Sequence, residues 1–138
     1  MVHQAEISIT TRETHEMHDI TGRVADIVKE SGVTAGIVNV FNVGSTGAIG
    51  AIELESGLAH DLPALLDRLI PPGRDYAHEE TWHDGNGHSH LQATLLGPSL
   101  TIPIAAGRPV LGTWQQVFFL ECDIKPRRRT IIVTVYGE

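Results

Sequence analysis

The sequence has one cysteine and none of the common nucleophile or nucleotide-binding motifs. A single thiol cannot form an internal disulfide, which favours a protein of the reducing cytoplasm. Cys122 lies in the apolar run VFFLEC and is expected to be a small core residue. The chain has no G-x-S-x-G, P-loop or G-x-G-x-x-G segment. It also lacks C-x₂-C pairs and an H-E-x-x-H helix, so zinc ribbons and zincin-type proteases are excluded.

Positive charge is also scarce. Ten Lys and Arg residues stand against 17 Asp and Glu, which gives a formal net charge of −7. This balance argues against a general nucleic-acid or membrane-surface binder, so nucleic acid is an unlikely partner. The exception is the run KPRRR, from Lys125 to Arg129, which is more typical of a solvated hairpin end but could bind a phosphate.

Residues 31–52 contain no charged residue and are long enough to cross a bilayer as a helix. Asparagine, serine, threonine and several glycines interrupt the apolar run, however. Two buried strands joined by a turn explain this composition better than a membrane span. Residues 1–20 are polar and charged, unlike a signal peptide. We therefore expect a cytoplasmic protein with no membrane partner.

Length and periodicity predict one domain, residues 1–138, of the α+β class. Apolar residues recur at helical spacing within residues 18–32 and 60–70, and the second stripe comprises Leu62, Leu65, Leu66 and Leu69. Asp61 is the expected N-cap of the second helix, with Pro63 early in it. Strands are expected at 6–11, 33–43, 45–55, 91–97, 99–105, 115–122 and 129–137. They predict a mostly antiparallel, β-sandwich-like sheet with two helices packed on it.

Residues 71–89 form a long polar segment, which we expect to be a functional or disordered loop. It holds His78, His83 and His88, and His90 follows directly, so four of the eight histidines gather there. In an extended chain His88 and His90 would point the same way, and His78 could supply a third imidazole. Such a set can hold a metal and leave a position open for water or substrate. A solvated polar turn is the alternative.

The sequence resembles the YjbQ family, whose members are named secondary thiamine-phosphate synthase enzymes. The resemblance rests on these matching residues: Tyr76, His78, Asp84-Gly85-Asn86, His90-Leu91, Gly97, Ser99, Gly107-Arg108, Leu111 to Gln115, Glu121, Arg127 to Arg129 and Gly137. It implies a homotrimer with a histidine-lined pocket near a subunit interface. It also implies a weak activity that joins a pyrimidine diphosphate to a thiazole phosphate with loss of pyrophosphate. A non-enzymatic trimeric metabolite- or metal-binding protein with a vestigial site is the alternative.

One departure from the family pattern concerns the pocket. Where the family usually carries His-Thr-Thr, this chain has Gly44, Ser45 and Thr46. We expect His88 to replace the missing imidazole, so that His78, His88 and His90 hold a divalent metal, with zinc the expected ion; a pocket that has lost its metal is the alternative. The remaining expected site residues are Glu53 and His78 for catalysis, and Ser45, Thr46, Asn86, Arg108, Thr113 and Gln115 for binding a small phosphorylated molecule. Arg108 could grip a phosphate with its forked guanidinium.

Overall fold

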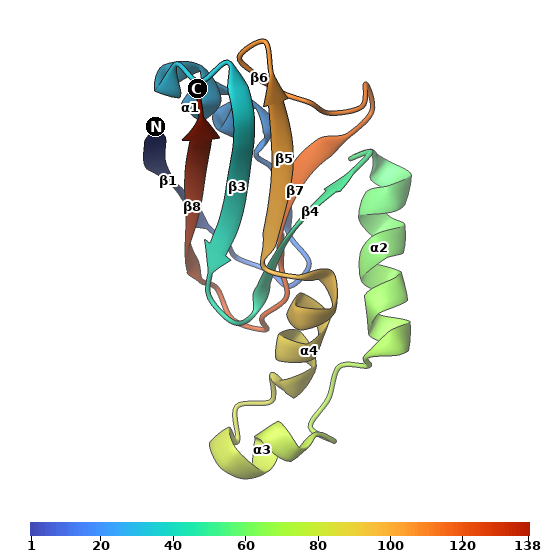
Figure 1. The fold of residues 1–138 in the computed structure, drawn as a ribbon. Coiled ribbons are helices and arrows are strands. Elements are labelled where there is room, and N and C mark those ends of the chain that lie inside the picture. Colours follow the sequence, from blue (N-terminus) through green and yellow to red (C-terminus); the bar gives the residue numbers. More distant parts are fainter.

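Two antiparallel sheets and four helices make up the structure, a computed structural model that describes residues 1–138 (Figure 1). The larger sheet has the order β1-β8-β3-β5-β6, formed by β1 (Val2–Thr10), β8 (Arg128–Gly137), β3 (Ala35–Val43), β5 (Ser99–Ala105) and β6 (Arg108–Pro109). The smaller has the order β2-β7-β4, formed by β2 (Met17–Asp19), β7 (Gln116–Glu121) and β4 (Gly47–Ile52). The predicted α+β class with antiparallel pairing is confirmed.

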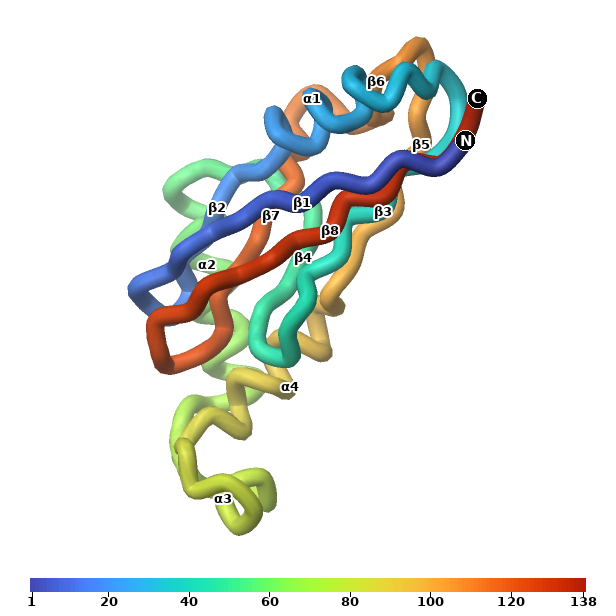
Figure 2. The backbone as a smooth tube through the Cα atoms, turned by 90° about the vertical axis from the view of Figure 1, so that its left-hand side faces the viewer, coloured from blue at the N-terminus to red at the C-terminus, as the bar shows by residue number.

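The main core lies between the two sheets and helix α1 (Thr21–Ser31). Burial alternates along β8, where Ile131, Val133 and Val135 are fully buried, as expected for a strand with one face on a core. Val24, Ile27 and Val28 of α1 pack into the same core. Figures 1 and 2 show the long strands of the larger sheet side by side, with both chain termini at one end of it.

A second core covers the other face of the smaller sheet, against α2 (Ser56–Leu69) and α4 (Gly87–Leu96). Phe118, Leu120 and Cys122 contribute from the β7 side, while Leu66 and Ala93 come from the two helices. Cys122 is fully buried, and burial raises the pKa of its thiol to about 12. The expectation of a core cysteine is confirmed, and its thiol stays protonated at neutral pH.

Helix α2 begins earlier than predicted, because Glu55 rather than Asp61 is its N-cap. The Glu55 carboxylate accepts hydrogen bonds from the backbone N–H groups of Gly57 and Leu58. Such a carboxylate satisfies free N–H groups of the first turn and complements the helix dipole. Of the predicted leucine stripe only Leu66 is fully buried, whereas Leu65 and Leu69 are exposed.

We expect Leu66→Ala to lower the free energy of unfolding by about 2–5 kcal/mol, because it removes a buried side chain and leaves a cavity. Urea denaturation monitored by circular dichroism would measure the change. Leu69→Ala is the matched control: the side chain is 60% exposed one turn further along, and its loss should matter little. Equal effects of the two substitutions would contradict the packing described for α2.

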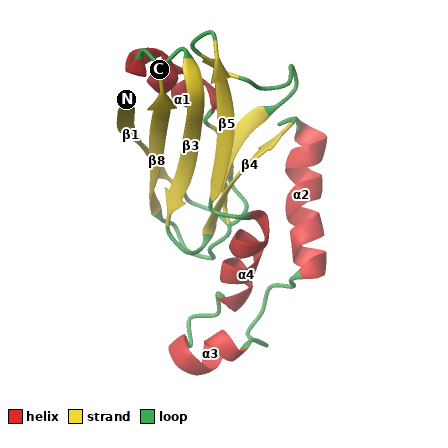
Figure 3. Cartoon of the chain, viewed as in Figure 1, coloured by secondary structure: helices red, strands yellow, loops and turns green.

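The prediction of a strand at residues 91–97 is wrong, because this segment lies in helix α4. Leu, Gln and Ala are good helix formers, although the order of apolar and polar residues in this segment resembles the alternation of a strand. The helix buries a face spaced by three and four residues, which carries the polar side chains His88, Ser89 and Gln92. The expected loop at 71–89 also contains a short helix, α3 (Ala77–Trp82), and the start of α4. Figure 3 shows α3 and α4 extending beyond one end of the sheets.

The uncharged segment 31–52 supplies β3, a turn and β4, which confirms two strands joined by a turn. None of the four helices combines the length and apolar character that crossing a bilayer requires.

Candidate functional site

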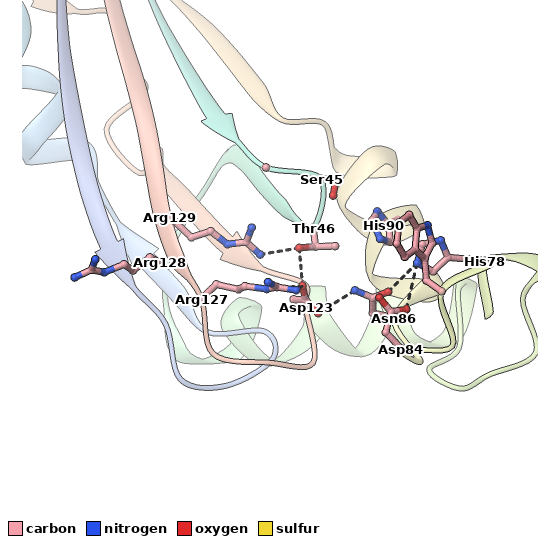
Figure 4. Close-up of a pocket in the computed structure, with 12 residues that line it drawn as sticks. Ser45, Thr46, His78, Asp84, Asn86, His90, Asp123, Arg127, Arg128 and Arg129 are labelled. Carbon is pink, nitrogen blue, oxygen red and sulfur yellow. Dashed lines mark hydrogen bonds and ion pairs between the residues drawn. The ribbon is translucent and has the colours of Figure 1, made fainter. Parts of the chain in front are cut away.

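A polar cavity of about 490 Å³ opens where three segments meet beyond the end of the sheets. The turn between β3 and β4 forms one side, the connection from β7 to β8 another, and the α3–α4 region the third (Figure 4). Its lining comprises Gly44, Ser45, Thr46, His78, Trp82, Asp84, Asn86, His90, Asp123, Arg127, Arg128 and Arg129. Only one of these twelve residues is hydrophobic, so the cavity suits a charged or strongly polar ligand.

A buried ion pair between Arg129 and Glu121 lies at the base of the cavity. Arg129 Nε donates to Glu121 Oε1 at 2.9 Å, Nη2 donates to Oε2, and both side chains are almost completely buried. The same Nη2 donates to Thr46 Oγ1 at 2.8 Å, and the guanidinium carbon lies 5.8 Å from the Phe119 ring centroid. The pair therefore fixes the β3–β4 turn against the β7–β8 connection.

Asp123 links the β3–β4 turn to the start of α4 across the cavity. Its carboxylate, fully buried, accepts from Thr46 Oγ1 at 2.9 Å, from Arg127 Nε at 2.8 Å and from Asn86 Nδ2 at 3.3 Å. Burial alone would raise the pKa of this carboxyl, but hydrogen bonds from the Ile124 N–H, Thr46, Arg127 and Asn86 hold the pKa below its ordinary value. Asp123 is consequently ionised and accepts every hydrogen bond it makes.

The third side carries two neighbouring imidazoles. His78 Nε2 lies 3.0 Å from Asn86 Oδ1 and 3.3 Å from Asp84 Oδ1, and the ring centroids of His78 and His90 are 4.5 Å apart (Figure 4). Burial, followed by the nearby His78, lowers the pKa of His90 below its ordinary value. At neutral pH His90 therefore presents a neutral ring that can accept or donate a hydrogen bond.

Each of the two glycines in DGNGHSH is explained by a different feature of the backbone. Gly85 has φ +71°, in the left-handed region that glycine adopts without strain. At Gly87, the first residue of α4, a Cβ atom would lie 2.8 Å from Tyr76 Cβ, so the helix start approaches Tyr76 too closely for a side chain. These two positions let the chain turn sharply into α4 and bring Asn86 and His90 to the cavity.

The structure brings His78 and His90 together but not His88, which does not line the cavity. The expectation of an extended H-x-H is wrong, because His88 and His90 lie in α4, where residues i and i+2 point about 200° apart around the axis. His88 is only 3% exposed, and its Nδ1 has no hydrogen-bond partner. Burial lowers the pKa of His88, although the Asp67 carboxylate and the Gly73 backbone oppose the shift.

Several other expected site residues lie outside the cavity, namely Glu53, Arg108, Thr113 and Gln115. Arg108 belongs to β6, and with Lys29 it lines a separate cavity of about 480 Å³ beside the end of α1. Glu53 is an exposed residue after β4, and Gln115 Oε1 accepts from the Gly112 N–H at 2.7 Å. By contrast, Ser45, Thr46, Asn86 and His78 line the cavity as expected.

Besides Gly44, the cavity also contains six residues that were not among the expected site residues: Trp82, Asp84, Asp123, Arg127, Arg128 and Arg129. Asp123, Arg127 and Arg129 form its charged network. The interpretation of KPRRR as a solvated hairpin end is wrong for Arg129, which is 6% exposed. Their strongest sequence signal is a carboxylate, Asp123, followed closely by a cluster of cations in an otherwise acidic chain. Of the three arginines, only the Arg128 side chain makes no hydrogen bond or ion pair, and Figure 4 shows it extending away from the histidines.

The metal-ligating side chains of a single chain do not form the expected site with three ligands. No three His, Cys, Asp or Glu side chains are grouped so that they could hold an ion. A Cβ atom at Gly44, where the family resemblance places a histidine, would lie 2.8 Å from Arg129 Nη1. The Arg129 guanidinium therefore lies next to the position that a histidine at residue 44 would take, and its positive charge favours an anion there over a metal ion.

Comparison with known proteins shows the family of the chain. Residues 5–138 match the family described as UPF0047 protein YjbQ-like. The chain belongs to this family. It is 42% identical to a UPF0047 protein of Methanothermobacter thermautotrophicus over 137 residues, which cover 99% of this chain and 94% of the relative. It is 31% identical to UPF0047 protein YugU of Bacillus subtilis over 133 residues, covering 95% and 97% of the two chains.

Solved structures of similar proteins share the whole fold of this YjbQ-like chain. A YbjQ-like protein of Sulfolobus solfataricus P2 is 37% identical with a TM-score of 0.94, covering 100% of this chain and 99% of the other. A protein of Aeropyrum pernix K1 is 32% identical with a TM-score of 0.90, covering 99% of both chains.

The stability of the fold should fall in acid because of two histidines, the buried His88 and the half-buried His90. Because the pKa values of His88 and His90 are lowered in the folded chain, unfolding lets both rings take up protons as the pH falls through about 6.5. Their contribution to stability is complete above that pH and is lost below it. Urea denaturation at about pH 7.5 and about pH 5.5 should show a smaller free energy of unfolding at the lower pH.

His88→Leu should reduce this pH dependence, whereas His60→Leu should leave it unchanged because the His60 side chain is 81% exposed. Equal stability of the wild-type protein at the two pH values would contradict the burial described for these rings.

Proposed function

We propose that this YjbQ-like protein is an enzyme that acts on a small phosphorylated molecule held in the polar cavity. The observation that carries the proposal is the division of the lining: arginine and hydroxyl groups on one side, and the His78–His90 pair with Asp84 on the other. The first side suits a phosphate group, and the second suits proton transfer at the atoms attached to it.

The anion side retains free donors. Nη1 of Arg127 and Nη1 of Arg129 make no hydrogen bond within the chain, although the other guanidinium atoms are engaged by Asp123, Glu121 and Thr46. The Ser45 hydroxyl is likewise without a partner. The hydrogen-bonded atoms fix the orientation of each guanidinium. Its free N–H groups therefore point in a fixed direction, which favours paired hydrogen bonds to phosphate oxygens.

The reaction proposed from the family resemblance joins a pyrimidine diphosphate to a thiazole phosphate with release of pyrophosphate. The leaving pyrophosphate carries concentrated negative charge, which oriented guanidinium and hydroxyl donors stabilise. No step is assigned to a metal, because the donors present do not complete a ligand set. Zinc binding at His78 and His90 stays a prediction, which elemental analysis of the purified protein would test.

Calorimetric titration with inorganic pyrophosphate tests the binding part of the proposal. Wild-type protein should bind it, and Arg127→Met should weaken binding at least about tenfold through loss of a charge-assisted hydrogen bond. Arg68→Met is the matched control, because Arg68 is an exposed residue of α2 outside the cavity. Equal affinities of the two variants would contradict the proposal.

We also propose that the protein is a homotrimer that associates through the outer face of the larger sheet. No helix covers this face in Figure 1, and Ile37, Phe41 and Tyr136 are 44%, 41% and 60% exposed on it. The register pairs Ile37 with Tyr136 and Phe41 with Ile132, so two apolar pairs lie on this face, separated by the polar pair of Asn39 and Thr134. Exposed apolar side chains grouped on an uncovered sheet face are typical of a protein interface.

Light scattering should give a trimer mass for the wild-type protein and a lower mass for Phe41→Glu, because a buried charge without a partner opposes association. Leu69→Glu places the same charge on α2, and its mass should match the wild type. A monomer mass for the wild-type protein at micromolar concentration would overturn the trimer.

A further inference from the structure

The hydrogen-bond network around Asp123 determines which nitrogen of His78 carries a proton. Asp123 is buried and ionised, and its Oδ1 accepts from the Asn86 side chain while Oδ2 is engaged by Thr46 and Arg127. An ionised carboxylate has no proton to donate. The Asn86 amide must therefore turn its NH₂ group toward Asp123.

This orientation leaves the Asn86 oxygen facing His78. Asn86 is 4% exposed, and its Oδ1 lies 3.0 Å from His78 Nε2. An amide oxygen only accepts hydrogen bonds, so Nε2 must be the donor. Asp84 Oδ1 lies 3.3 Å from the same nitrogen without a hydrogen bond to it, and its negative charge also favours a proton on Nε2. When His78 is neutral, its Nδ1 then carries the lone pair.

We propose that Asp123 and Asn86 are positioning residues that hold His78 as the Nε2–H tautomer, so that Nδ1 is the nitrogen available to accept a proton. The catalytic meaning of this inference rests on the proposed function. In that reaction the amino group of the pyrimidine gives a proton to Nδ1 as the carbon–oxygen bond to pyrophosphate breaks, and it takes the proton back when the thiazole nitrogen bonds to that carbon. Nε2 keeps its own proton throughout. The Asp84 carboxylate then lies beside the resulting imidazolium and stabilises it, as a carboxylate does for a catalytic histidine.

The network explains the chemistry of the DGN sequence. Asn86 bridges two groups that need opposite partners, an anionic acceptor and a ring N–H donor, and an amide is the side chain that offers one donor group and one acceptor at this length. An Asp at position 86 would place two carboxylates against each other, and a Leu would leave both neighbours unpaired. Asp84 and Asn86 therefore both act on the same ring nitrogen, from opposite ends of the Gly85 turn.

Nuclear magnetic resonance of protein labelled with ¹⁵N-histidine tests the proposal. Two-bond proton–nitrogen correlations recorded at about pH 8 distinguish the two tautomers of a neutral ring. The His78 signals, identified by their loss in His78→Asn, should show the Nε2–H form alone. An Nδ1–H form in the wild-type protein would overturn the proposal.

Asp123→Asn is the decisive variant. Thr46 and the Arg127 guanidinium both require an oxygen at the former Oδ2 position, whereas only the Ile124 N–H requires one at the former Oδ1 position, so the new NH₂ group should face Asn86. Asn86 should then turn its oxygen toward residue 123 and its NH₂ group toward His78, which switches His78 to the Nδ1–H form. Thr46→Val is the control: it removes a donor to Asp123 without affecting the Asn86 contact, and His78 should stay in the Nε2–H form. An unchanged tautomer in Asp123→Asn would overturn the proposal.

If Asp123→Asn fails to fold, the double variant Asp84→Ala, Asn86→Ala provides the test. Without either side chain the ring should populate both tautomers, and a single unchanged tautomer would contradict the proposed role of the network. The measurement needs no substrate. Its failure is therefore distinct from failure of the proposed function, which pyrophosphate binding tests separately.

Discussion

Arg129→Met should lower the free energy of unfolding by about 3–5 kcal/mol, the cost of breaking a buried ion pair by removing one partner. The substitution leaves the Glu121 carboxylate fully buried without its cation and removes the guanidinium above Phe119. It also deprives Thr46 Oγ1 of a donor. Urea denaturation at neutral pH would measure the loss.

Arg128→Met is the matched control, because Arg128 is exposed and makes no ion pair, and its effect should stay within about 0.5 kcal/mol. Adding Glu121→Gln to Arg129→Met should recover part of the loss, since no buried charge then remains unpaired. Equal effects of the two arginine substitutions would show that the Glu121–Arg129 pair does not stabilise the fold.

In the proposed reaction, His78→Asn should lower the rate at which a pyrimidine diphosphate releases pyrophosphate in the presence of a thiazole phosphate by about 100- to 10,000-fold, the usual contribution of a general acid or base. His78 is chosen because Asn86 and Asp84 orient its ring at the cavity. A coupled assay for pyrophosphate would follow the reaction.

His83→Asn is the control for this prediction. His83 follows α3, is exposed, has φ +58° that asparagine tolerates, and does not line the cavity, so turnover should equal that of the wild type. Pyrophosphate binding by the wild-type protein without any turnover would favour the non-enzymatic alternative, a trimeric metabolite-binding protein.

The strands could be predicted because β-branched residues and a period of two dominate them. Helix α4 could not, because its buried face is polar: His88, Ser89 and Gln92 point into the structure, and Gln92 is held there by Asp67 and the Ile70 carbonyl. A sequence pattern reveals apolar residues, whereas Gln92 on this face is stabilised by hydrogen bonds to residues far away in the chain. The conformation of the H-x-H segment was misjudged for the same reason.

The candidate site was predicted where its residues are clustered in sequence and missed where only the fold brings them together. His78, Asn86 and His90 fall within one short segment, whereas Asp123 and Arg129 reach the cavity through the β7–β8 connection. Arg108 shows the opposite error. It is a cation in a glycine-containing turn, but β6 places it beside α1 in a separate cavity. The residue types of a turn do not indicate at which end of a sheet the hairpin lies.

A crystal structure of the protein with bound pyrophosphate tests the central claim most directly, because cations also line a cavity away from the histidines. The account predicts phosphate oxygens within hydrogen-bond distance of Arg127 Nη1, Arg129 Nη1 and the Ser45 hydroxyl, close to His78. Pyrophosphate bound beside Lys29 and Arg108, with nothing at the histidine cavity, would contradict it.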